Sequence, residues 1–144
     1  MARTVRARSI GIAALAALLL AAMPGRLAGA FAPVTIATLP IATVVVFDGG
    51  ALVVLTGQMA VRMNRTAVFE MASTDGAIRC AGATDRSGSG RVDCAPAFDL
   101  VFQVPRQMLG RFNGAHVDAR HGYRMATGWG ESADARALAG MLGR

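Results

Sequence analysis

The residues whose spacing says most about chemistry are the two cysteines, Cys80 and Cys94. They lack the Cys-x-x-Cys spacing of redox-active thiols, and no helix N-terminus is expected beside them to activate a thiol. In an oxidising compartment, two such cysteines form a structural disulfide. We therefore expect a Cys80–Cys94 disulfide, which closes a loop of about 15 residues and adds about 3 kcal/mol to the free energy of unfolding.

Two histidines, His116 and His121, are the other candidate metal ligands. Their His-x4-His spacing fits a zinc site, but the cysteines do not have the Cys-x2-4-Cys spacing that usually accompanies it. On a strand, an offset of five residues places the two rings on opposite faces of the sheet. We expect both histidines to be exposed, and we expect no metal site and no cofactor.

Residues that could catalyse a reaction do not occur in a recognisable pattern. Ser89 stands between Gly88 and Gly90 but lacks the Gly-x-Ser-x-Gly pattern of a nucleophile elbow, and the same glycines do not match a phosphate-binding loop. Glu70 and Glu131 are the only glutamates, and the aspartates mostly lie beside glycine, serine or arginine, as turn residues do. These patterns favour a protein that is not an enzyme.

A group of basic and aromatic residues near the end of the chain is a candidate partner-binding surface. It consists of Arg111, Arg120, Tyr123, Arg124 and Trp129. Guanidinium groups interleaved with aromatic rings suit a partner that presents acidic groups. The alternative is that these residues form the solvated side of the last hairpin.

The first thirty residues have the pattern of a secretory signal peptide. Arg3, Arg6 and Arg8 precede an uncharged run over residues 9–23, and Ala28-Gly29-Ala30 supplies the small residues that signal peptidase recognises. The run would span only about 22 Å as a helix, less than the hydrocarbon core of about 30 Å. We expect residues 1–30 to be a signal-peptide helix cleaved after Ala30, and residues 31–144 to be a single domain exported to the periplasm or secreted.

Export would also change the charge of the protein. The whole chain has 15 basic and 9 acidic residues, for a net charge of +6. Residues 1–30 hold four of the arginines, so the remaining 114 residues would carry 11 basic against 9 acidic side chains. A nearly neutral domain lacks the basic stripe that nucleic-acid binding needs, so we expect no nucleic-acid partner.

Two membrane topologies remain open. Residues 9–23 would act as an anchor if they were not cleaved, and residues 27–47 form a second run without charge. Against a second span, this run contains Pro33 and Pro40 and is rich in threonine and valine, which favour strands. We expect membrane contact only if the signal segment is retained. The sequence does not decide whether residues 31–47 join the sheet or form an extended arm.

The rest of the chain shows the two-residue alternation of half-buried strands. An Asp75-Gly76 hairpin turn places Met71 opposite Cys80, and across the next loop Cys80 falls opposite Cys94. A three-residue turn at residues 64–66 would place Val61 opposite Phe69. Alternation continues over residues 98–104, and again over residues 117–121 and 123–129.

The end of the chain changes to helical periodicity over about residues 132–142. Ser132 is the expected N-cap, and Ala135, Leu138 and Leu142 follow helical spacing. The predicted fold is therefore mainly β: a small antiparallel meander, sandwich-like or barrel-like, with a short C-terminal helix.

These features together favour an exported, non-catalytic binding or accessory protein, whose partner is a protein or a small molecule. One alternative is a membrane-anchored accessory subunit of an inner-membrane complex, with the N-terminal helix retained. The second alternative is a small periplasmic hydrolase or metal-binding protein. The sequence does not identify the partner or the oligomeric state.

Overall fold

The computed structural model describes residues 33–144 and confirms a mainly β fold with a short C-terminal helix. The expected signal peptide and its cleavage site after Ala30 lie outside the described residues. The elements are β1 (Thr35–Phe47), β2 (Leu52–Arg62), β3 (Ala67–Ser73), β4 (Arg79–Thr84), β5 (Ser89–Ala95), β6 (Phe98–Gln103), η1 (Arg106–Met108), β7 (Gly114–Arg120), β8 (Tyr123–Trp129), η2 (Gly130–Ser132) and α2 (Ala135–Met141). In residues 33–144, no helix is long and apolar enough to cross a membrane.

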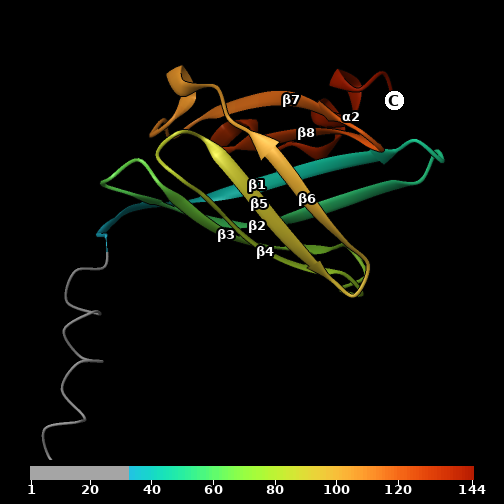
Figure 1. Cartoon of the computed structure of the whole chain (residues 1–144), viewed down its shortest axis with the longest axis horizontal. Coiled ribbons are helices and arrows are strands. Elements are labelled where there is room, and N and C mark those ends of the chain that lie inside the picture. Colours follow the sequence, from blue (N-terminus) through green and yellow to red (C-terminus); the bar gives the residue numbers. More distant parts are fainter. Residues whose placement is uncertain (1–32) are drawn as a thin grey trace, which may run out of the picture. The chain divides into compact units, whose positions relative to one another are not determined.

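All eight strands belong to one antiparallel sheet, in the order β6-β5-β4-β3-β2-β1-β8-β7. The sheet curls so that β5 and β6 pass in front of β1 and β2 in Figure 1. Its two edge strands, β6 and β7, are therefore brought towards each other, and the sheet forms a nearly closed barrel.

Side chains bridge the seam between the two edges of the sheet. The hydroxyl of Tyr123 donates to the carbonyl of Val101 at 2.7 Å and accepts from the amide of Val101 at 2.8 Å. Further along, Oδ2 of Asp118 accepts from the amide of Gln103 at 2.7 Å. These bonds satisfy backbone amide and carbonyl groups of the edge strand β6, which could otherwise pair with a strand of another molecule.

Most of the segment 31–47, from Thr35 to Phe47, forms the first strand. β1 lies in the sheet between β2 and β8, so this segment is a strand and not an extended arm. It runs through Pro40, although proline has no amide hydrogen to donate to a neighbouring strand. Pairing with β8 begins only at Ile41, so Pro40 lies where β1 has one neighbouring strand and a missing amide hydrogen is tolerated.

The register around the cysteines is as predicted. Met71 pairs with Cys80, and Cys80 pairs with Cys94. The two cysteines form a disulfide, with their Cα atoms 4.1 Å apart.

The predicted register between β2 and β3 is wrong by two residues. Val61 pairs with Ala67, not with Phe69. The turn has three residues, as predicted, but it comes one residue earlier: the amide of Arg62 donates to the carbonyl of Thr66 at 2.9 Å, so residues 63–65 form the turn. Oδ1 of Asn64 accepts from both the amide and the hydroxyl of Thr66, and Arg65 has a φ of 66°. A two-residue shift leaves the same side chains facing the core, but it moves Met63 into the turn, where it is 67% exposed.

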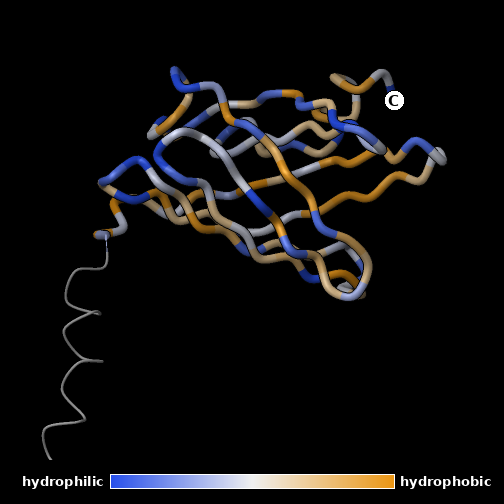
Figure 2. The backbone as a smooth tube through the Cα atoms, in the orientation of Figure 1, coloured by the Kyte–Doolittle hydropathy of each residue, from blue (hydrophilic) through white to orange (hydrophobic). Residues whose placement is uncertain are grey.

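Two apolar clusters lie on the opposite faces of the sheet. The larger fills the barrel, and the smaller packs α2 against the outside of β1 and β8. β1 contributes alternate residues to each: Ile41 and Val45 face the interior, whereas Val44 and Val46 pack with Leu138 and Leu142 of α2. Burial on both faces from residue 41 to residue 46 explains why the end of β1 is orange in Figure 2.

The C-terminal helix lies within the predicted range but begins later than expected. Its N-cap is Asp134, whose Oδ1 accepts from the amide of Ala137 at 2.9 Å, so the prediction of Ser132 was wrong. Ser132 instead donates from its amide and its hydroxyl to Oδ1 of Asn113, which ties the end of β8 to the start of β7. Because Ser132 is bonded to Asn113, Asp134 and not Ser132 caps the helix.

Candidate functional site

The two ends of the barrel are built differently. One end holds the Cys80–Cys94 disulfide and a group of aromatic rings. The ring of Phe47 lies 5.1 Å from that of Phe98 and 6.2 Å from that of Tyr123, both in edge-to-face contact. We call this the closed end.

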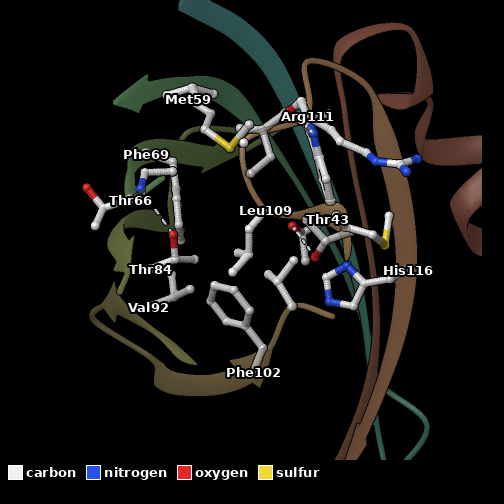
Figure 3. A pocket seen from close by; sticks show the side chains of 18 of the residues that line it. Thr43, Met59, Thr66, Phe69, Thr84, Val92, Phe102, Leu109, Arg111 and His116 are labelled. Atoms are coloured by element: carbon white, nitrogen blue, oxygen red, sulfur yellow. Dashed lines mark hydrogen bonds between the residues drawn. The ribbon is translucent and has the colours of Figure 1, made fainter. Parts of the chain in front are cut away.

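The opposite end, the cavity end, encloses a space of about 50 Å³. Residues 108–111, in the connection between β6 and β7, line one side of it, and Leu109 projects into it (Figure 3). We call residues 108–111 the covering segment. Most of its lining is apolar: Ile41, Met59, Val61, Ala67, Phe69, Met71, Val92, Phe102, Val104, Met108, Leu109, Met125 and Trp129. Exposed residues, including Arg65 and Arg111, also line it, so the cavity reaches the surface at this end.

Three polar side chains form a row across the inner face of neighbouring strands. His116 on β7 pairs with Thr127 on β8, which pairs in turn with Thr43 on β1. The hydroxyls of Thr43 and Thr127 are 3.0 Å apart and hydrogen-bonded, and all three residues are buried and line the cavity. We call these residues the polar row.

His116 is the unusual member of the polar row. It is 8% exposed, and neither ring nitrogen has a hydrogen-bond partner among residues 33–144. Its ring lies 6.1 Å from that of Trp129, in edge-to-face contact. Burial lowers the pKa of His116 below its usual value, against the opposing influence of Asp118, so the ring is neutral at neutral pH.

The expectation that both histidines are exposed was wrong for His116. β7 begins at Gly114, three residues before the strand predicted from alternation, and this places His116 on the inner face. His121 lies in the turn between β7 and β8 and is exposed, as expected. In residues 33–144, no group of three or more metal-ligating side chains lies together.

The five residues of the candidate partner-binding surface lie in different settings. Trp129 is buried, and its Nε1 donates to the carbonyl of Arg111 at 3.0 Å at the cavity end. Tyr123 is bonded across the seam, Arg120 pairs with Asp118 at 3.3 Å, and Arg124 is exposed on β8. The group therefore does not form one surface of exposed side chains, and its role in partner binding stays a prediction.

Sequence reasoning missed the cavity and the polar row. A signal was present, because Thr43 and Thr127 each occupy an inward position flanked by apolar inward residues: Ile41 and Val45 on β1, and Met125 and Trp129 on β8. Two such threonines predict an interior hydroxyl pair only once β1 is known to pair with β8, 84 residues away in the chain.

Comparisons of this chain with protein-family models, with curated proteins and with solved structures find no match. The functional argument therefore depends on the geometry of the cavity end.

Proposed function

We propose that this protein is an exported, non-catalytic binding protein that holds a small molecule in the cavity of its barrel. The observation that carries the proposal is the buried ring of His116, which has no hydrogen-bond partner among residues 33–144 and lines a mostly apolar cavity. A buried polar group without a partner costs about 1–3 kcal/mol, so a cavity that keeps one is better explained by binding than by stability.

The architecture and the lining support the same proposal. An eight-stranded barrel has an interior that side chains just fill or that holds one small ligand. Binding cavities are mostly apolar with a few polar groups that orient the ligand, which describes this cavity and its polar row. Four methionines, Met59, Met71, Met108 and Met125, line it, and their flexible side chains can adapt to a guest.

The disulfide supports export, because it is compatible with an oxidising compartment. Intact mass spectrometry of the protein recovered from its native host tests this part directly. We expect the mass of residues 31–144, with an increase of about 2 Da on reduction as the disulfide takes up two hydrogens. A full-length mass would instead favour the membrane-anchored alternative.

Methyl NMR of the methionines tests the binding proposal. The protein would be labelled at its methionine methyl groups and titrated with a library of small amphiphiles. We expect ligands to shift the signals of Met59, Met71, Met108 and Met125, which line the cavity, and to leave those of Met63 and Met141 in place, because these two are exposed. Shifts confined to Met63 and Met141 would contradict the proposal.

A pair of variants at Leu109 controls for binding elsewhere. Leu109 lies on the covering segment and projects into the cavity, so its replacement leaves the strands intact. Leu109→Phe should fill the cavity and weaken binding, whereas Leu109→Ala should enlarge it and admit longer ligands. Equal binding to both variants would show that the ligand does not occupy the cavity.

A further inference from the structure

We infer that the cavity is selective for a short, uncharged amphiphile whose head both donates and accepts a hydrogen bond, such as an alcohol or a primary amide. This inference rests on the proposed function and specifies its ligand class. It follows from the hydrogen-bonding groups that the polar row leaves free, from the absence of a buried charge among the described residues that line the cavity, and from the size of the cavity.

The polar row presents both donors and acceptors to a ligand. A neutral imidazole has one N–H donor and one nitrogen acceptor, and in His116 neither has a partner within the described part of the chain. In the Thr43–Thr127 pair only one hydroxyl donates to the other, so the second hydroxyl hydrogen is also free. A head group with both functions can bond to His116 and to the threonines, in place of the water that would fill the cavity otherwise.

The charges around the cavity disfavour an ionised head. Among the residues of 33–144 that line it, Arg65 and Arg111 are the only charged ones, and both are exposed. The guanidinium group of Arg111 points away from the centre of the cavity in Figure 3. A carboxylate beside the neutral ring of His116 would therefore lose its water without gaining a buried cation, whereas an uncharged head loses only hydrogen bonds that the polar row replaces.

The position of the polar row sets the orientation of the ligand. The inward pairs of β1 and β8 follow one another along the barrel, and the Thr43–Thr127 pair lies between two apolar pairs. The Ile41–Trp129 pair lies nearer the covering segment, where Trp129 bonds to Arg111. The Val45–Met125 pair lies deeper in the barrel. The head therefore binds well inside the barrel, and the apolar part contacts rings such as Phe69 and Phe102.

The volume limits the ligand to a short chain. A cavity of about 150 Å³ holds benzene, and this one is about 50 Å³. Scaled by volume from the benzene cavity, it accommodates about two heavy atoms as it stands. A ligand of five or six requires the methionine side chains or Leu109 to move.

Two matched pairs of probes test the ligand class, with binding followed through the methionine methyl signals and the fluorescence of Trp129, the single tryptophan. 1-Butanol and pentane have equal numbers of heavy atoms, and so do butyramide and butyrate. We expect butyramide to bind at least tenfold more tightly than butyrate, because only the ion loses its charge solvation. In His116→Phe, we expect the affinities for 1-butanol and butyramide to fall about tenfold and that for pentane to stay unchanged or rise.

Two further variants keep the test decisive. His121→Phe makes the same replacement at an exposed position and should leave all four affinities unchanged. Thr127→Val keeps His116 and should weaken 1-butanol binding about threefold, which preserves a readout if His116→Phe does not fold.

The outcomes separate the ligand class from the function itself. Two results would overturn the ligand class and leave the binding function standing. One is an equal loss of affinity for pentane and 1-butanol in His116→Phe, and the other is tighter binding of butyrate than of butyramide. If none of the four probes shifted the cavity methionines but a member of the amphiphile library did, the ligand class would fail and the binding function would stand. If neither the probes nor the library shifted them, both proposals would fail.

Discussion

The closed end and the cavity end are formed by the same eight strands, but the first is filled by side chains and the second is not. At the closed end, a disulfide and the rings of Phe47, Phe98 and Tyr123 fill the barrel, and the Tyr123 hydroxyl is hydrogen-bonded. At the cavity end, a space of about 50 Å³ remains and His116 is unpaired. The closed end has features that stabilise the fold, and the cavity end has those of a binding site. Strained or unsatisfied groups are expected at functional sites, where stability is given up for activity.

The largest test of this comparison removes the disulfide. The double variant Cys80→Ala/Cys94→Ala should lower the free energy of unfolding by about 3 kcal/mol, because the unfolded chain regains the entropy that the crosslink removed. Urea denaturation of the variant and of the oxidised and reduced protein would measure the loss. A loss below about 1 kcal/mol would mean that the disulfide does not stabilise the closed end as the comparison requires.

A smaller effect is expected from Tyr123→Phe, also at the closed end. This change keeps the ring against Phe47 but removes the hydroxyl that bonds to both polar groups of Val101. We expect the free energy of unfolding to fall by about 1–2 kcal/mol, since two edge-strand groups lose their partner. Thermal and urea unfolding would measure it, and an unchanged value would show that water replaces the hydroxyl without cost.

The matching replacement at the cavity end should act in the opposite direction. His116→Phe removes a buried polar ring that has no partner in the described part of the chain. We expect the free energy of unfolding to stay the same or to rise by up to about 1 kcal/mol. A clear loss of stability, by the same urea method, would mean that His116 makes a structural hydrogen bond, and the contrast between the two ends would fail.

The smallest effect concerns pH. Because burial lowers the pKa of His116 in the folded protein, the unfolded chain binds a proton more readily between that lowered pKa and the usual histidine pKa of 6.5. The stability of the wild type should therefore decrease as the pH falls below 6.5 and through the folded pKa. In His116→Phe this contribution disappears, whereas His121→Phe retains it. The urea midpoints of the wild type, His116→Phe and His121→Phe would be measured at pH 7.5 and 5.5. A pH dependence that is smaller only in His116→Phe would assign it to the cavity end.

The closed end could be predicted from sequence to a much greater extent than the cavity end. Cys80 and Cys94 were placed opposite each other because short turns and two-residue alternation fix the register of consecutive strands. The polar row depends on the pairing of β1 with β8, whose hydroxyls meet 84 residues apart, and local patterns carry no information on such contacts. The N-cap was also missed, because the bond between Ser132 and Asn113 is a tertiary contact. Local chemistry thus determined the strands and one end of the barrel, but not the cavity between distant strands.

The seam has a consequence for hydrogen exchange. Separating β6 from β7 would break the Tyr123 and Asp118 bridges but none of the seven strand ladders, because β6 and β7 are the two edges of the sheet. Opening there requires less free energy than opening at any ladder. The amides of Val101 and Gln103, held by side chains across the seam, should therefore take up deuterium before the amides of β1, which is paired on both sides. The barrel thus has a defined line along which its interior can first open to solvent.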